Sequence, residues 1–376
     1  MDIMKDTIDN FINNYNGTLN SEDIINEYLK CLNETNNAEK YVVKKLIKDK
    51  VEKMQITEKN RINRVKKLEK LKKLELPEQR SKEWYEMRKD KLTASSLASA
   101  VGHCHFQSRD ELILDKIVEK PFEPNPITEW GVKYEDVAIM FYEELFNVNI
   151  LDFGMVPHPE FEAFGASPDG ICDETGSEEH IARMVEIKCP PKRKFTKSVP
   201  PHYLMQVQGQ LEVCDLDECD FFQVKLVDYD TYDDYCKDVF EIDGEIQKGR
   251  THLNYPKGIV ATYKKGEKLS YEYFPLNQKN EEIESIVETY KTKENFFEIK
   301  YWKIERYECT LVHRDKDWWI EKIDKILTFY NDLIHYKNDA VELEELKKRV
   351  EFSKKRRKKT VFKPLDEFQL ISDDED

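Results

Sequence analysis

The sequence lacks a long apolar run, a paired-cysteine motif and an excess of positive charge. No stretch of about 18 apolar residues occurs, so we expect no membrane-spanning helix. The N-terminus carries no apolar core of the kind found in secretion signals, so we expect no secretion signal. The eight cysteines are scattered and form no CxxC pair, which predicts reduced thiols in an intracellular protein. The triplet at 103–105, His-Cys-His, has no second ligand pair at zinc spacing and is interpreted as a loop.

The net charge of -15 over 376 residues argues against nucleic-acid binding as a global property. Local clusters matter more than the sum, so the distribution of charge has to be followed along the chain. The length suits one large domain with additions, or two domains. We expect a helical N-terminal extension at 1–76, a main domain at 77–350, and a charged, disordered tail at 351–376.

Three basic segments stand out against this acidic background. A predicted helix at 59–73 carries Lys66, Lys67 and Lys70, and a loop after the predicted core strands carries Lys192, Arg193 and Lys194. The helix is either a solvated surface or a contact for nucleic-acid phosphates, and the loop is expected on the side where DNA would enter. The run at 354–359 is interpreted as either a nuclear-import signal or a nucleic-acid contact.

The chain is organised around two predicted strands. The first reaches Asp169 through a Pro-Asp-Gly turn, and the second carries Glu186 and Lys188 two residues apart. Strand side chains alternate faces with a period of two, so Glu186 and Lys188 point the same way while Ile187 points to the other layer. If the two strands pair as a hairpin, Asp169 comes close to Glu186.

Two carboxylates and one ammonium on a patch of sheet have a specific chemical interpretation. The carboxylates repel each other, and a hard divalent cation such as Mg²⁺ relieves that repulsion with oxygen ligands. A lysine beside them can orient a water molecule, which suits metal-assisted hydrolysis of a phosphodiester. The alternative is that Glu186 and Lys188 form an ordinary surface pair on a strand.

Flanking segments supply further candidates. Arg88 ends one predicted helix and Ser95 opens the next, a combination that suits a terminal phosphate unless Ser95 is only a capping residue. Glu135 falls on an apolar helix stripe, where it needs a partner such as a metal or a metal-bound water. Gln206 and Gln210 lie one turn apart on a later helix. Residues 221–226 read as a buried, central strand.

The order and spacing of these pieces resembles the lambda-exonuclease (YqaJ-like viral recombinase) family of PD-(D/E)xK nucleases. The resemblance covers roughly residues 80–227 and extends more loosely to about 337. It rests on Trp84, Arg88, Thr93-Ala94-Ser95, Gly131, Glu135, Ser167-Pro168-Asp169-Gly170, Glu186-Ile187-Lys188 and the Gln206-x-Gln208 helix.

The resemblance implies a restriction-endonuclease-like α/β fold, in which a mixed sheet is flanked by helices, here with an added helical N-terminal region. It implies that Asp169, Glu186 and the Ile187 carbonyl bind Mg²⁺, with Mn²⁺ as a substitute, and that Glu135 contributes directly or through water. Lys188 would position the attacking water. The remaining implied roles are 5′-phosphate binding by Arg88, Ser95 and Ser167, and support of the site by Gln206 or Gln208.

The implied activity is Mg²⁺-dependent exonuclease action on one strand of duplex DNA from its 5′ end, in viral recombination, repair or replication. A single-strand annealing protein is the implied partner, and the composition suits a large DNA virus acting in host cytoplasm or nucleus. The added segments could block the ring-shaped trimer of known relatives, so the oligomeric state stays open. The alternatives are a structure-specific endonuclease or RNA-cleaving nuclease on the same scaffold, and a non-catalytic DNA-binding scaffold.

Overall fold

The computed structural model describes residues 2–32, 36–89, 91–118, 125–192, 195, 197–274, 276 and 280–361. The chain divides into two compact units, Met1–Lys73 and Leu74–Asp376, and each is described by itself. No helix among these residues is both long enough and apolar enough to cross a membrane.

The first unit is helical, as expected. It consists of α1 (Asp2–Asn13), α2 (Ser21–Lys30) and α3 (Asn37–Lys72). Buried isoleucines and valines on the three helices form its core, including Ile8, Ile24 and Ile47. Asn36 and Glu39 form a capping box at the start of α3. The basic segment at 59–73 is therefore the last part of one 36-residue helix rather than a helix of its own.

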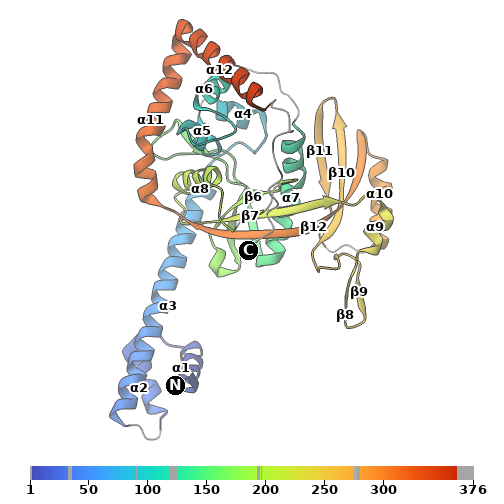
Figure 1. Ribbon diagram of the computed structural model, residues 1–376. Helices are drawn as coiled ribbons and strands as arrows, with labels where there is room; N and C mark the ends of the chain where they lie inside the picture. Colours follow the sequence, from blue (N-terminus) through green and yellow to red (C-terminus); the bar gives the residue numbers. More distant parts are fainter. Residues whose placement is uncertain are drawn as a thin grey trace, which may run out of the picture. The chain divides into compact units, whose positions relative to one another are not determined.

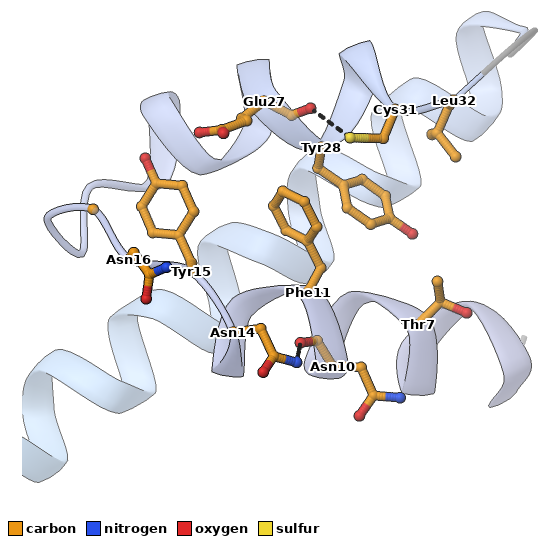
Figure 2. A pocket seen from close by; sticks show the side chains of 11 residues that line it. Thr7, Asn10, Phe11, Asn14, Tyr15, Asn16, Glu27, Tyr28, Cys31 and Leu32 are labelled. Carbon is orange, nitrogen blue, oxygen red and sulfur yellow. Dashed lines mark hydrogen bonds between the residues drawn. The ribbon is translucent and has the colours of Figure 1, made fainter.

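A groove of about 700 Å³ opens between α1 and α2 (Figure 2). Its walls combine the rings of Phe11, Tyr15 and Tyr28 with asparagine amides, and Phe11 meets Tyr28 edge to face. Glu27 is the charged residue among those lining it. The groove therefore contains no cluster of acid, base or metal-ligating groups, and the candidate chemistry lies in the second unit.

The second unit is built on a seven-stranded mixed sheet with the order β11-β10-β12-β7-β6-β5-β2. Only the β6–β7 pair is parallel, and the other pairs in this sheet are antiparallel. Figure 1 shows the long strands β7 and β12 side by side. The bounds are β2 Val148–Leu151, β5 Gly170–Gly176, β6 Met184–Lys188, β7 Glu218–Asp228, β10 Lys257–Lys265, β11 Lys268–Tyr273 and β12 Phe296–His313.

The prediction of a central buried strand at 221–226 is confirmed, because β7 is the middle strand of this sheet. Its consecutive residues Phe221 and Phe222 point to opposite faces. Phe222 packs against Phe141 of α7 (Pro126–Phe146), and Phe221 packs against Tyr203 of α8 (Pro201–Val213). The sheet is thus flanked by helices, and the predicted α/β fold class is correct.

The expected hairpin is wrong in one respect. The strand before the Pro-Asp-Gly segment, β4 (Phe164–Ala166), does not pair with β6 but lies in a small separate sheet with β1 (Leu92–Thr93) and β3 (Val156–Pro157). The strand that pairs with β6 is β5, which begins after Asp169 and contains the acidic residues Asp173 and Glu174. Asp169 therefore lies at the junction between two sheets.

The remaining elements surround this framework. A second core forms where α9 and α10 pack on the β10 side, around Tyr235, Phe274 and Ile283. The bounds are α4 Lys82–Lys89, η1 Ala94–Ser96, α5 Leu97–Ala100, α6 Arg109–Ile117, η2 Glu178–His180, α9 Tyr232–Lys237, β8 Phe240–Ile242, β9 Glu245–Gln247, α10 Asn280–Lys291, α11 Lys316–Asn338 and α12 Ala340–Val361.

The tail expectation needs correction. Residues 351–361 continue α12, so the first part of the stretch expected to be disordered is helical. Two kinds of ion pair accompany this helix: Glu351 with Lys355 one turn later, and Arg357 with Glu111 of α6 at 2.7 Å. Residues 362–376 lie outside the described part of the chain.

Candidate active site

The predicted carboxylate and lysine come together at the end of β6. Glu186 and Lys188 point to the same side of the strand, and the Lys188 ammonium donates a hydrogen bond to Glu186 Oε1. Glu186 is completely buried, whereas Lys188 is partly exposed. A buried carboxylate needs compensating donors, and this pair is therefore part of an internal site rather than a surface pair on a strand.

Asp169 joins this cluster from the junction before β5. Gly170 is paired with Val185, so the same register puts Asp169 opposite Glu186. The Ile187 N–H donates to Asp169 Oδ2 at 2.7 Å. Burial, followed by repulsion from Glu186, raises the pKa of Asp169 well above its usual value, against the opposing effect of Lys188. The predicted proximity of the two carboxylates is correct, although the strand that provides it is not the one expected.

A close backbone approach explains the glycine after Asp169. A Cβ atom added to Gly170 would lie 2.3 Å from Cγ2 of Ile150 on β2. That distance is far inside van der Waals contact, so a larger residue would force the Ile150 side chain or the backbone beside Asp169 to shift.

Two amides of α8 complete the surroundings of Glu186. Gln206 donates to Oε1 at 2.6 Å, and Gln210 donates to Oε2 at 2.7 Å. Gln208 does not contact the site: it donates to the His313 carbonyl and accepts from the Asp315 N–H. Residues four apart share a helix face and residues two apart do not. Gln208 is therefore corrected to a structural contact, and Gln210, missing from the predicted site, takes the place beside Gln206.

Lys188 is held in its charged form by this environment. Burial lowers the pKa of Lys188, but Glu186 and Asp169 together outweigh burial and raise it above its usual value. Its ammonium also lies 5.2 Å from the ring centre of Tyr203. Lys188 is consequently a positive hydrogen-bond donor beside two carboxylates.

Glu135 lies near this cluster but is paired elsewhere. Its Oε1 is 2.8 Å from a guanidinium nitrogen of Arg80. Burial raises the pKa of Glu135, and Arg80 and Lys188 oppose that effect. The expected need for a partner was correct, but the partner in the structure is an arginine 55 residues away. No local pattern in the sequence indicates this pairing.

The donor set fits a hard divalent cation. Asp169 and Glu186 present carboxylate oxygens whose mutual repulsion a cation would relieve. Across the described residues, however, no three His, Cys, Asp or Glu side chains are already arranged as a metal-ligand set. The third carboxylate nearby, Glu135, is the one that Arg80 holds.

A second cluster gathers hydroxyls around Arg88, as expected. The Arg88 guanidinium donates to Ser167 Oγ at 3.3 Å and to Ser95 Oγ at 3.4 Å, and it stacks over Trp84 at 4.2 Å. Trp84 Nε1 also donates to Ser167 Oγ at 3.0 Å, and Thr93 Oγ1 lies 3.1 Å from Ser95 Oγ. The helix expected after Ser95 consists only of the short η1 and α5.

Among the residues that the structure describes, this cluster contains no negative charge. In the part of the chain that the structure describes, no carboxylate forms an ion pair with Arg88, and burial lowers the pKa of its guanidinium. A partly buried cation surrounded by neutral hydroxyls favours an anionic ligand. Residues 167 and 169 carry the two clusters, so only Pro168 separates the anion pocket from the carboxylates.

The predicted nucleic-acid contacts belong to separate segments of the chain. Lys66 and Lys70 are exposed on α3 and Lys67 is half-buried, all in the first unit. Lys192 is exposed in the loop after β6. Arg193 and Lys194 fall outside the described residues.

Comparison with known proteins supports the resemblance. Residues 83–217 match the model of the YqaJ-like viral recombinase domain. The chain is 31% identical over 321 residues to uncharacterized protein R354 of Acanthamoeba polyphaga mimivirus, covering 77% of this chain and 58% of that protein. It is 26% identical over 160 residues to a protein of African swine fever virus (strain Badajoz 1971 Vero-adapted), covering 36% of this chain and 46% of that protein. The chain thus spans about half the length of these relatives.

Among solved structures, the chain is similar to an alkaline exonuclease from Laribacter hongkongensis. The sequences are 20% identical and the TM-score is 0.39, with 74% of this chain and 100% of that chain covered. A phage-related exonuclease from Haemophilus somnus 129PT gives 14% identity and a TM-score of 0.34, with coverage of 65% and 95%.

Proposed function

We propose, on the premise that residues 83–217 form a YqaJ-like viral recombinase domain, that this chain is a metal-dependent exonuclease. Its substrate is duplex DNA, and it degrades one strand from the 5′ end. The observation that supports this most is the adjacency of the two clusters. Ser167 belongs to the Arg88 pocket, and Asp169 belongs to the carboxylate cluster.

Asp169 and Glu186 would hold Mg²⁺, or Mn²⁺ in its place, with the Ile187 carbonyl and Glu135 as further oxygen ligands. When bound, such a cation supplies Lewis-acid stabilisation of the phosphate and lowers the pKa of a bound water. The donor set is made of oxygen atoms, which is the kind that these hard cations prefer.

The protein's own groups prepare the reaction. Gln206 and Gln210 each donate to one carboxylate oxygen of Glu186 and together fix its orientation. Lys188, as an ammonium, donates a hydrogen bond to the attacking water and balances negative charge that develops on the phosphate. Because Lys188 is charged, orienting the water is the role we assign to it.

The Arg88 pocket would hold the 5′-terminal phosphate. Arg88, Ser95 and Ser167 offer charged and neutral donors to its oxygens, and the partial burial of Arg88 strengthens these contacts. Holding the terminal phosphate there fixes which phosphodiester reaches Asp169. Lys66, Lys67, Lys70, Lys192, Arg193 and Lys194 would contact the remaining phosphates, so binding should weaken as salt increases.

The biological setting follows from this activity. Degrading one strand of a DNA end leaves a single strand, so we propose a role in viral recombination, repair or replication beside a single-strand annealing protein. The relatives from mimivirus and African swine fever virus are viral proteins. The protein would act inside the host cell, in cytoplasm or nucleus.

The decisive experiment compares linear duplexes that carry a 5′-phosphate or a 5′-hydroxyl, each with and without Mg²⁺. We expect hydrolysis only with Mg²⁺, faster on the phosphorylated duplex. Covalently closed circular DNA is the matched control and should stay intact. Its cleavage would indicate an endonuclease, and tight binding without hydrolysis in Mg²⁺ or Mn²⁺ would indicate a non-catalytic scaffold.

A further inference from the structure

Arg80 has an unusual backbone conformation. Its φ is 63°, in the left-handed region that residues with a Cβ atom rarely adopt. Neighbours fix this conformation on both sides. The Gln79 amide donates to the Phe153 and Pro168 carbonyls, each at 2.9 Å, and Ser81 caps α4 by accepting from the Trp84 N–H. Backbone strain that the surroundings maintain in this way is concentrated at functional sites.

The Arg80 side chain reaches into a group of carboxylates. It pairs with Glu135 at 2.8 Å, and its positive charge also opposes the effect of burial on the pKa values of Asp136 and Asp152. Yet 39% of the side chain remains exposed. The guanidinium is therefore positioned by acids on one side and open to solvent on the other.

The segment at 79–88 contacts, at both of its ends, the segment that carries both clusters. At its C-terminal end Arg88 donates to Ser167, and at its N-terminal end Gln79 donates to the Pro168 carbonyl, next to Asp169. Arg80 thus lies at the carboxylate end and Arg88 at the anion-pocket end. If the terminal phosphate of a strand binds at Arg88, a following phosphate would lie toward Arg80.

We propose that Arg80 is a substrate-binding residue that pairs with Glu135 only until substrate and cation bind. Glu135 then exchanges Arg80 for the cation, and Arg80 pairs instead with a backbone phosphate next to the scissile bond. This inference rests on the proposed function. The exchange is chemically matched on both sides, because the planar guanidinium pairs equally well with a carboxylate and with a phosphate.

The exchange also accounts for an otherwise awkward arrangement. Three carboxylates, Asp169, Glu186 and Glu135, lie near one another without forming a ligand set among the described residues. Arg80 neutralises Glu135 while no cation is present. A permanent structural ion pair would explain the same contact, but it would leave Arg80 unable to contact DNA.

The salt dependence of DNA binding separates these two cases. A residue that contacts a phosphate releases counterions, so losing it reduces the slope of log K against log salt by about one. The assay measures binding of a 5′-phosphorylated duplex in Ca²⁺, which also takes oxygen ligands. The variants are Arg80→Ala, Arg80→Gly and Arg80→Lys. Lys82→Ala is the control, because it removes the same charge from a side chain that is 82% exposed.

We expect Arg80→Ala and Arg80→Gly to weaken binding on the order of tenfold and to reduce the slope, while Arg80→Lys retains the slope. Glycine at position 80 relieves the backbone strain. Equal loss of binding in Arg80→Gly and Arg80→Ala would therefore assign the effect to the missing side chain. Thermal unfolding of each variant checks that it is folded. We also expect Mn²⁺ to bind DNA-free Arg80→Ala more tightly than wild type, as measured by titration calorimetry.

An unchanged slope in Arg80→Ala, or a loss equal to that of Lys82→Ala, would overturn the inference and leave a structural ion pair. Unchanged Mn²⁺ affinity would overturn the exchange with Glu135. Either result, with wild-type hydrolysis intact, leaves the proposed function standing. A wild-type protein that neither binds nor hydrolyses DNA would contradict both this inference and the proposed function.

Discussion

The two clusters of the site differ in how their charges are balanced. In the carboxylate cluster, Glu186 and Asp169 face Lys188, and amides fill the remaining positions, so acid exceeds base. In the pocket, Arg88 faces hydroxyls and the ring of Trp84. The first arrangement is completed by a cation and the second by an anion. The difference indicates a division of labour, with chemistry in one cluster and recognition of the strand end in the other.

The largest effect should come from Lys188→Ala. Removing the ammonium leaves two carboxylates without their positive neighbour and the water without its donor. We expect hydrolysis to fall on the order of a thousandfold on every DNA substrate, measured as release of acid-soluble nucleotides. Retained DNA binding is the control for folding. Full activity in Lys188→Ala would show that hydrolysis does not take place at the carboxylate cluster.

Arg88→Ala should have a selective effect. We expect the rate on a 5′-phosphorylated duplex to fall roughly tenfold to a hundredfold, because a charged hydrogen bond to the terminal phosphate is lost, and the rate on a 5′-hydroxyl duplex to stay nearly unchanged. The ratio of the two rates is the measurement. Equal losses of rate on both substrates would show that the Arg88 pocket does not recognise the 5′-phosphate separately from the chemistry at the carboxylate cluster.

The glutamines of α8 offer a matched pair. Gln210→Ala removes a donor to Glu186, and we expect hydrolysis to fall roughly tenfold. Gln208→Ala, two residues away on the same helix, should instead lower the free energy of unfolding by about 1–3 kcal/mol and leave the rate of the folded enzyme unchanged. Steady-state kinetics and urea unfolding of both variants test this. If Gln208→Ala is fully folded but loses activity, Gln208 must contribute to the active site, which contradicts its position on the other face of α8.

The smallest effect concerns stability. The pKa of Asp169 is raised in the folded protein above its usual 3.8. The folded state therefore binds the proton more tightly than the unfolded state, and the stability contributed by Asp169 is lost as pH rises through the folded-state pKa. In EDTA, Asp169→Asn should thus unfold at a higher temperature than wild type at neutral pH, with no difference below pH 3.8.

Thermal melts across this pH range check the prediction. Asp230→Asn, at an exposed position, controls for the loss of one negative charge. An Asn variant that is less stable than wild type at neutral pH would show that the hydrogen bond from the Ile187 N–H outweighs the repulsion from Glu186.

Local periodicity determined much of this protein from sequence alone. The two-residue period of a strand put Glu186 and Lys188 on one side, and the two are hydrogen-bonded in the structure. The helical period put Gln206 and Gln210 on one face, and both donate to Glu186. Where the resemblance offered Gln208 instead, the helical period was the better guide. The buried central strand and the helical first unit were also predictable, because apolar patterns reflect burial.

Only the tertiary structure decided how distant residues meet. Asp169 approaches Glu186 through β5 rather than through the strand before it, Ser167 turns to Arg88, and Arg80 turns to Glu135. These contacts join residues that are 17 or more positions apart. Such partners are set by the order of strands in the sheet and by the packing of helices on it, and no short-range pattern of residues encodes that order.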